Sequence, residues 1–257
     1  MNLKQTRGII LTVSDHGEAD KIVSFYSPDL GRATAIAKGA KRSKKRFVNK
    51  LEEFSCLRLF YQQGKRGGLL FLAQAELEHA FLTLRRHYDR YVVASMICEL
   101  VGLFTGERDP DPRIFSLLSW TFLFLDRGNA PLRAAVFFHL KILTLTGYQP
   151  ALHQCRGCGK EVGQSKVYGF HPAGGTLLCE TCRQRDERPL SPLSLQSVKI
   201  LQRLDVLEPA RLDRLHFSGS TIRETLTMLH RYSRHLLQRE IRSRRLVEAL
   251  QHEMDHQ

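Results

Sequence analysis

The hydrophobic positions of the first 80 residues alternate with a period of two, which is typical of β-strands. In GIILTVSDHG (8–17), Ile9, Leu11 and Val13 take alternate positions. Similar segments follow at 21–27, 32–40, 54–63 and 69–78. SPDLG marks a turn, and GKRGG (64–68) predicts a hairpin between the last two strands. Five strands with short connections predict a small all-β barrel at 1–80. A five-stranded OB-fold fits this size, although strand count alone does not exclude an SH3-like barrel.

Beyond residue 80 the period changes to that of helices. Val93, Ile97, Leu100 and Phe104 form one apolar stripe along 91–104. Residues 130–147 are apolar nearly all round, which predicts a central helix. Further helices are expected to begin at Asp111–Pro112, at Ser191–Pro192 and at the capping-box pair Thr221 and Glu224, the last continuing to about residue 250.

These patterns predict an α+β, multidomain fold. An OB-fold nucleic-acid-binding domain would occupy 1–80 and an α-helical domain 81–257. A Gly- and Cys-rich segment without a sustained period interrupts the second domain at 153–188.

Four of the six cysteines form two CxxC pairs that are separated by 20 residues. They are Cys155, Cys158, Cys179 and Cys182. Each CxxC turn directs two thiolates to one point, and two such turns complete the tetrahedron that zinc prefers. A segment of about 30 residues is too small to build its own core, so a metal ion would hold it together. The spacing predicts one structural Zn²⁺ in a zinc-ribbon-like insert. A disulfide pair or a redox CxxC fits less well, and Cys56 and Cys98 are expected to be buried apolar residues.

The charge of the chain favours a polyanionic partner. The formal net charge is +13, and residues 1–79 carry 14 basic against 8 acidic side chains. Nucleic acid is the commonest partner of such a field. No apolar run is long enough to suggest a membrane span, and the first residues lack the apolar core and cleavage site of a signal peptide. We therefore expect a cytoplasmic protein without a membrane partner.

No motif in the sequence indicates an enzyme. HEMDH (252–256) matches the H-E-x-x-H metalloprotease signature. It stands at the end of a predicted helix, where helices fray, and a third ligand and a substrate groove are not evident. The sequence contains no P-loop, no G-x-S-x-G and no K-x-D-G ligase nucleophile. We expect a non-enzymatic protein.

Three blocks of sequence resemble the RecO family of bacterial recombination mediators, over essentially the whole chain. They are ILTVSDHGEADKIVSFYSPDLGRATAIAKGAKRSKKRF (10–47), LTLTGYQP (143–150) and FHPAGGTLLCETC (170–182). The GEADKIVSFYSPDLG part is the most distinctive, whereas the CxxC pairs alone would indicate only a zinc ribbon. Some family members lack the cysteines, which favours a structural role for zinc; here the set is complete.

This resemblance implies a DNA repair and homologous recombination protein of the RecF pathway, acting in the bacterial cytoplasm at the nucleoid. Such proteins bind single- and double-stranded DNA and anneal complementary strands. They contact the C-terminal tail of single-stranded DNA-binding protein. With RecR they load RecA on gaps, so that RecA is an indirect partner.

The basic loop KGAKRSKKRF (38–47) is the first candidate DNA-binding site, at the mouth of the barrel. OB-folds bind single strands by pairing a basic groove with stacking side chains. Successive strand residues face opposite ways, so only one of Phe25 and Tyr26 can lie on the binding face. The expected phosphate contacts are Lys38, Lys41, Arg42, Lys44, Lys45 and Arg46, with Phe47 as a second stacking candidate. Ordinary core packing is the alternative for each of these aromatic residues.

The last predicted helix offers a second basic surface, since Arg231, Arg234, Arg242 and Arg245 recur at helical spacing. Annealing requires two strands to be held together while their charges are screened, and two basic surfaces suit that task. Both surfaces also fit a solvated basic face, and the loop alone fits a nuclear localisation signal. Two other functions fit the same residues: a zinc-ribbon protein associated with RNA or the ribosome, and a scaffold that docks the tail of single-stranded DNA-binding protein.

Overall fold

The computed structural model describes residues 3–64 and 69–254 and contains two compact units. Part of the GKRGG hairpin signal, and the end of HEMDH, lie outside the described residues. One unit comprises the residues up to Ala94 together with Val101–Gly128, and the other comprises Ser95–Leu100 with the residues from Asn129 onward. The first therefore contains helices as well as the barrel, and the domain division at residue 80 stays a prediction. Within the described ranges, no helix combines the length and apolarity needed to cross a membrane.

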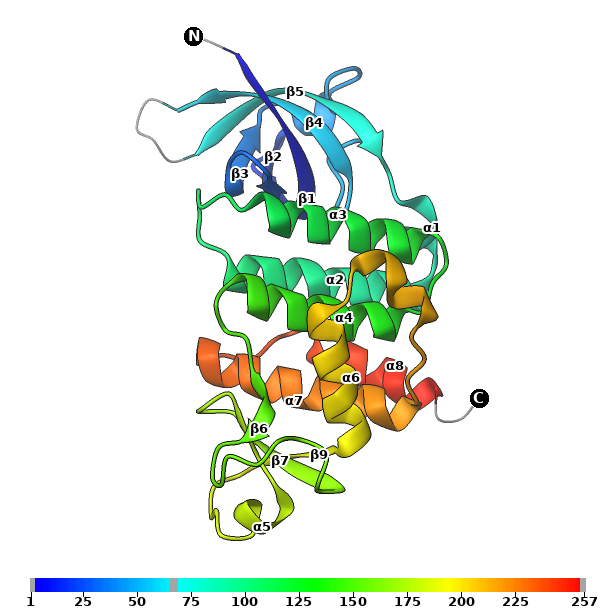
Figure 1. The fold of residues 1–257 in the computed structure, drawn as a ribbon. Helices are drawn as coiled ribbons and strands as arrows, with labels where there is room; N and C mark the ends of the chain where they lie inside the picture. The colour runs from blue at the N-terminus through cyan, green and yellow to red at the C-terminus, as the bar shows by residue number, and fades with distance from the viewer. Residues whose placement is uncertain (1–2, 65–68, 255–257) are drawn as a thin grey trace. The chain divides into compact units, whose positions relative to one another are not determined.

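The first unit contains a closed five-stranded barrel, as the sequence predicts (Figure 1). Its strands are β1 (Lys4–His16), β2 (Asp20–Ser27), β3 (Gly31–Ala37), β4 (Cys56–Gln63) and β5 (Leu70–His79). The order around the barrel is β1-β2-β3-β5-β4, with β3 and β5 parallel and the other pairs antiparallel. This order is that of the Greek-key OB-fold, and it excludes a simple meander.

The long strand β1 closes the barrel because it pairs on both edges. Lys4–Ile9 pairs with β4, and Ile9–His16 pairs with β2. A register shift between Ile10 and Thr12 bends the strand between these two pairings. The interior is filled by alternating strand residues such as Val23, which is fully buried.

Three helices complete the first unit, in whole or in part: α1 (Leu82–Arg86), α2 (Tyr88–Phe104) and α3 (Pro112–Asp126). Asp111 is the N-cap of α3 and accepts a hydrogen bond from the backbone N–H of Arg113 at 2.8 Å, with Pro112 at the first helical position as predicted. The backbone N–H of Asp111 donates to the Tyr26 hydroxyl at 3.2 Å, which ties the start of α3 to β2. Gly31 has a φ of +65°, and a Cβ at this position would overlap the backbone carbonyl of Asp109.

In the second unit, α6 (Leu195–Val206) and α7 (Gly219–Leu237) pack against the predicted central helix α4 (Pro131–Leu145), and α8 (Arg244–Met254) packs against α7. Nearly every face of α4 is buried. At its centre His139 donates or accepts a 2.7 Å hydrogen bond with the Ser233 hydroxyl of α7. The rings of His139 and His230 lie 5.3 Å apart. Burial lowers the pKa of His139 well below its ordinary value and the pKa of His230 to about 4.

The insert forms a four-stranded sheet in the order β6-β8-β7-β9. Its elements are β6 (Ala151–Cys155), β7 (Val167–His171), β8 (Thr176–Leu178), the short helix α5 (Glu180–Arg183) and β9 (Ser191–Ser194). Ser191 and Pro192, predicted to begin a helix, instead pair with β7. The helix begins after them at Leu195, because the Ser194 side chain accepts the N–H of Ser197 at 3.2 Å.

The predicted capping box and the single long C-terminal helix are also corrected. Ser218, not Thr221, caps α7, and Glu224 instead accepts hydrogen bonds from the Ser194 backbone and hydroxyl at 2.7 and 2.8 Å. The helix ends at Leu237, and its C-cap residue, Gln238, has a left-handed φ of 53°.

A new helix, α8, follows this break. The chain just before it is held by a distant residue, since the Glu99 carboxylate accepts the backbone N–H groups of Arg242 and Ser243 at 2.7 and 2.9 Å. The hydrophobic periodicity of the C-terminal segment could not predict this contact with Glu99.

We predict that Gly31→Ala destabilises the protein by at least about 3 kcal/mol, because it adds a clash with rigid backbone to an unfavourable φ. Gly17 is a matched control: it also has a positive φ, but a Cβ there meets nothing within 4 Å. Gly17→Ala should cost only about 1 kcal/mol. Urea unfolding measures both, and equal costs would contradict the steric role of the Asp109 carbonyl.

We predict that stability falls as the pH drops below about 6.5. The unfolded chain then protonates His230, whereas the folded protein resists protonation down to its pKa of about 4. This difference amounts to about 2 kcal/mol at pH 5. In urea unfolding at pH 7.5 and pH 5, His230→Gln should therefore lose about 2 kcal/mol less than the wild type. An equally steep loss in His230→Gln would refute the assignment.

Candidate nucleic-acid interface and metal centre

The basic loop between β3 and β4 is fixed to the barrel at both ends. At its start, the Asp20 carboxylate accepts the backbone N–H of Gly39 at 2.8 Å. At its end, the Lys50 ammonium donates to the carbonyl oxygens of Lys45 and Ala75 at 3.1 and 2.9 Å. Lys50 thus uses its charge to hold the loop on β5. These contacts hold in place the backbone from which the exposed cations project.

The six predicted cations divide into two groups. Lys41 and Arg42 lie against the acidic β1–β2 turn: the Lys41 ammonium is 2.8 Å from a carboxylate oxygen of Asp15, and the Arg42 guanidinium is 3.7 Å from Glu18. The other four side chains are exposed, and none of them pairs with a carboxylate in the part of the chain that the structure describes. They are Lys38, Lys44, Lys45 and Arg46.

The aromatic residues predicted to stack on bases are in the core. Phe47 is 3% exposed and packs inside the barrel, where it anchors the loop, so its ring is not available at the surface. Phe25 and Tyr26 are both fully buried, although one of them was expected on the binding face. Phe25 fills the barrel interior, and Tyr26 packs outside it, where its hydroxyl contacts Asp111 at the start of α3.

Phe71 on β5 is an aromatic residue at the loop that the sequence did not single out. Its ring is half-buried, and the Lys38 ammonium lies 5.5 Å from the ring centroid. Phe71 occupies the outward position between the buried Leu70 and Leu72. The alternation of apolar residues in β5 could have indicated that Phe71 faces outward. Its place beside the basic loop follows from the pairing of β3 with β5, which the sequence pattern does not reveal.

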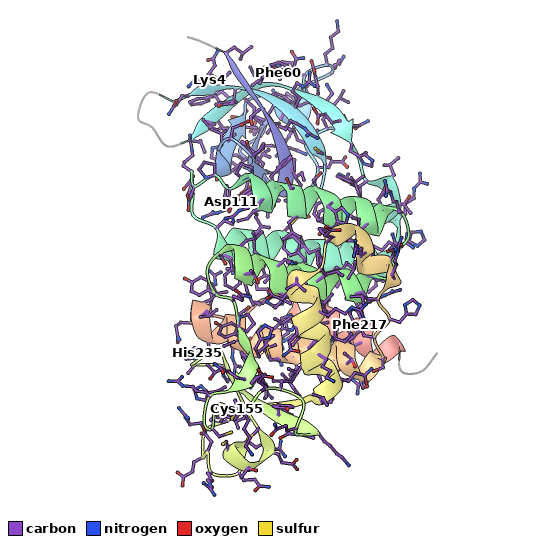
Figure 2. The ribbon with its side chains drawn as sticks, in the orientation of Figure 1. Lys4, Phe60, Asp111, Cys155, Phe217 and His235 are labelled. Atoms are coloured by element: carbon purple, nitrogen blue, oxygen red, sulfur yellow. The ribbon has the colours of Figure 1, made fainter. Side chains whose placement is uncertain are left out.

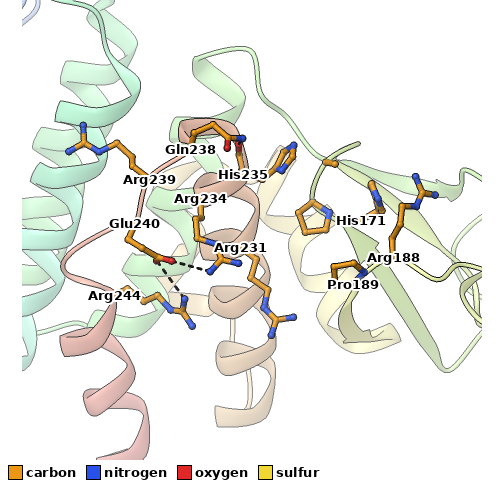
Figure 3. A pocket seen from close by; sticks show the side chains of 12 residues that line it. His171, Arg188, Pro189, Arg231, Arg234, His235, Gln238, Arg239, Glu240 and Arg244 are labelled. Atoms are coloured by element: carbon orange, nitrogen blue, oxygen red, sulfur yellow. Dashed lines mark hydrogen bonds and ion pairs between the residues drawn. The ribbon is translucent and has the colours of Figure 1, made fainter.

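The four predicted C-terminal arginines do not share one helix face. Arg231 and Arg234 lie on α7, Arg242 lies in the connection after Gln238, and Arg245 lies on α8. Arg231 and Arg234 line a pocket with residues of the insert (Figure 3). Arg242 and Arg245 line a neighbouring hollow, which shares Glu240 and Arg244 with that pocket. The sequence missed Arg188, Arg239 and Arg244, which line the first pocket too. The run of arginines in QREIRSRRL (238–246) was the only signal for Arg239 and Arg244, and Arg188 lies outside it.

The four predicted cysteines converge in the insert. Cys155 ends β6, Cys158 follows in the next turn, Cys179 follows β8 and Cys182 lies in α5 (Figure 2 labels Cys155). Their sulfur atoms all lie within 4.8 Å of one another. Gly157 permits this approach, since a Cβ there would stand 2.9 Å from the Cys182 sulfur. No histidine or carboxylate of the described residues joins the cluster.

The arrangement fits a tetrahedral metal ion. The sulfur atoms of Cys158 and Cys179 are 3.8 Å apart, the edge of a tetrahedron whose metal–sulfur bonds are about 2.3 Å. Four cysteines within this distance could hold one metal ion, and four sulfur ligands would leave no open coordination position for catalysis. Cys56 and Cys98 are buried elsewhere, as expected.

The electrostatics of the cluster also favour a cation. Burial opposes ionisation of Cys155, but the backbone N–H groups of Cys179, Cys158 and Gly157 outweigh it and lower the Cys155 pKa to about 6. The hydrogen bond with Cys179, together with burial, raises the pKa of Cys182 to about 12. Ionisation of Cys155 is therefore favoured, whereas ionisation of Cys182 beside it is strongly opposed. A bound cation removes this opposition.

We predict that the purified protein contains about one metal ion per chain, and that Cys158→Ser and Cys182→Ser each reduce the content to near zero. Elemental analysis measures this directly. Cys56→Ser is the control, because Cys56 lies outside the cluster, and it should keep the full metal content. Retention of the metal by both cluster variants would show that these residues are not ligands.

Comparison with known proteins agrees with this architecture. The family model described as "Recombination protein O N terminal" matches residues 1–81, and "Recombination protein O C terminal" matches residues 85–245. The chain is 34% identical to the DNA repair protein RecO of Syntrophus aciditrophicus over 96% of both chains. It is 32% identical to that of Syntrophobacter fumaroxidans over 96% of this chain and 98% of the relative. For Rubrobacter xylanophilus the identity is 34%, over 82% and 85%. The chain belongs to the RecO family of DNA repair proteins.

Proposed function

We propose that this protein is a non-enzymatic mediator of homologous recombination. It binds single- and double-stranded DNA and anneals complementary strands. With RecR, it helps to load RecA on gaps that are coated by single-stranded DNA-binding protein, whose C-terminal tail it contacts. Family membership supports this proposal, and the basic surfaces of both units support the DNA-binding part of it.

One observation carries the DNA-binding proposal: four exposed cations stand on the loop without carboxylate partners in the described part of the chain. They are Lys38, Lys44, Lys45 and Arg46. Because Lys50 and Asp20 hold the loop on the barrel, the backbone that carries these charges is in place before a strand binds. Such preorganisation lowers the entropy cost of binding. A basic groove on an OB-fold is a common way to hold single-stranded nucleic acid.

Phe71 supplies the aromatic contact in this proposal, in place of Phe47. A base that stacks on the partly exposed Phe71 ring would lie beside the Lys38 ammonium, so that its phosphate could reach the same cation. Stacking of this kind is worth about 1–3 kcal/mol per base and does not depend strongly on sequence. Binding to many different sequences would be expected of a protein that anneals any complementary pair.

The arginines of the second unit provide another surface, on α7, on α8 and in the connection between them. Arg231, Arg234, Arg242 and Arg245 would contact a second strand or a second segment of the same strand. The cysteine cluster would hold one structural zinc ion, which keeps the insert folded next to these arginines. The zinc ion would have a structural role and would take part in no chemical reaction.

We predict that Lys44→Ala combined with Lys45→Ala weakens single-stranded DNA binding and reduces the slope of log K against log salt concentration by about 1.4, because each lost phosphate contact removes about 0.7. Lys41→Ala combined with Arg42→Ala is the matched control, since it removes the same charge from the same loop. Its effect on the slope should be less than half as large, because Asp15 and Glu18 already engage these cations.

Fluorescence anisotropy with a labelled oligothymidylate at several salt concentrations gives both slopes. Equal slopes for the Lys44/Lys45 variant and the wild type would remove the loop from the DNA-binding surface. Matched RNA oligonucleotides, and an annealing assay on complementary strands coated with single-stranded DNA-binding protein, test the wider function. Preferential RNA binding without annealing would support an RNA-associated protein instead.

A further inference from the structure

A pocket of about 480 Å³ lies between the barrel and the helices α1 and α2, within the first unit. Leu51 and Phe54 are buried and form its floor, whereas Val13 of β1 and the exposed Tyr91 of α2 stand at its sides. Its volume falls in the range of ordinary binding pockets. None of the residues proposed above to contact DNA lines it.

The floor of the pocket is held in one arrangement. The Phe54 ring packs edge-on against the rings of Tyr91 and Phe122, with centroid distances of 5.1 and 5.6 Å. Phe54 has a φ of +72°, which a bulky residue adopts only where its surroundings hold it. Its backbone N–H donates to the carbonyl oxygen of Ile10 at 2.9 Å. The apolar floor is therefore formed before any occupant binds.

Arg85 holds the chain on the acidic side of the pocket. Its guanidinium donates to the Glu52 carboxylate and to the backbone carbonyl of Glu53. It also donates to the Ser55 hydroxyl at 2.7 Å. Because Arg85 is engaged in this way, a preformed pocket meets the occupant, and binding loses little conformational entropy.

The charge of the lining is opposite to that of the chain. The lining carries three carboxylates and two cations, a formal charge of −1, on a chain whose net charge is +13. These charged residues are Asp15, Glu52, Glu53, Lys21 and Arg85. Asp15 is paired with Lys41, and Glu52 with Arg85. An acidic hollow on a basic protein favours a cationic occupant.

Glu53 is the carboxylate that an incoming cation can use. In the ranges that the structure describes, it forms no ion pair with a lysine or arginine. Its carboxylate accepts a long hydrogen bond of 3.5 Å from the Tyr91 hydroxyl. Glu53 is half-buried beside the apolar floor, where a charge pair is screened less than on the open surface.

The lining argues against three other kinds of occupant. Carboxylates repel the phosphates of a nucleic-acid strand, and they repel an acidic peptide for the same reason. A metal ion is not favoured either, since the cysteine cluster is the one group of described residues whose ligand atoms lie close enough together to hold one. A basic protein segment remains.

We propose that this pocket docks a segment of another protein, one that places a large apolar side chain on Phe54 and Leu51 and a lysine or arginine against Glu53. Buried apolar floors with tyrosine at the edge are typical of the residues that dominate binding at protein interfaces. Tyr88 is 60% exposed and lies one helical turn before Tyr91, so it extends the same surface.

The pocket adjoins the basic loop. Residues 51–54 follow directly after Lys50, which holds that loop on β5, and Asp15 pairs with Lys41 of the loop. A protein docked in the pocket would therefore stand beside a strand that the loop binds. This consequence rests on the proposed function, whereas the docking itself does not.

The test begins with a random dodecapeptide library displayed on phage and selected on the full-length protein. Counter-selection on Glu53→Lys removes peptides that bind elsewhere. The peptides that remain should combine a lysine or arginine with a large apolar residue. Failure to recover any peptide that depends on the pocket, or recovery of acidic ones, would overturn the proposal.

Affinities of one recovered peptide, synthesised with a fluorescent label, then test the two contacts. Tyr91→Ala should weaken binding at least about 10-fold, as loss of an interface tyrosine does. Replacing the cation of the peptide by alanine should weaken binding to the wild type by at least about 3-fold but should have no effect on Glu53→Gln, because the pair is already broken there. Equal effects on both proteins would refute the contact with Glu53.

Glu107→Gln is the matched control, because Glu107 is an exposed carboxylate of the same unit that does not line the pocket. Its peptide affinity should stay within about 2-fold of the wild type. Melting temperature and metal content show whether each variant is folded. If Tyr91→Ala does not fold, the nearly isosteric Glu53→Gln decides alone through the comparison of the two peptides.

Further outcomes identify a different occupant. Self-association of the wild type in sedimentation, abolished by Glu53→Lys, would mean that a second copy of the chain fills the pocket, and the proposal would be wrong. The DNA affinity of folded Tyr91→Ala should stay within about 2-fold, and a larger loss would assign the pocket to nucleic acid instead. A wild type that binds the peptide but no DNA would refute the proposed function and leave the docking site standing.

Discussion

Closely spaced cations repel one another, and this constraint governs both basic surfaces of the molecule. The protein opposes the repulsion with a few carboxylates and with rigid backbone. Asp15 and Glu18 partly neutralise the base of the barrel loop, while Lys50 holds its backbone. Glu240 performs a similar task between two arginines of α7 and α8. Each surface thereby keeps an excess of positive charge.

Local patterns predicted much of the fold. The alternation of five segments specified the barrel strands to within a few residues, and the Asp111–Pro112 pair marked the start of α3. The CxxC spacing likewise predicted the sulfur cluster. These features depend on residues close together in the chain, where backbone periodicity, capping and turn geometry operate.

The predictions that failed depend on partners far away in the sequence. Glu224 has the spacing of a capping box, but its carboxylate bonds to Ser194, 30 residues earlier. The C-terminal segment is periodic, yet its helix breaks at Gln238. Glu99, far away in the sequence, binds the chain just before the next helix, α8. Phe47 was a candidate surface aromatic because its neighbours are charged, but its ring is buried in the hydrophobic core of the barrel. Such tertiary contacts override local preference.

The contact between the barrel and the start of α3 crosses the boundary between the two regions that the family models match. The N-terminal family model ends at residue 81, but Tyr26 is buried and bonds to Asp111, and Gly31 lies against Asp109. A fragment cut at that boundary would expose the Tyr26 ring and leave the outside of β2 uncovered. The compact unit that contains the barrel also includes the first turns of α2 and the residues Val101–Gly128, so the end of the N-terminal family model does not coincide with the end of that unit.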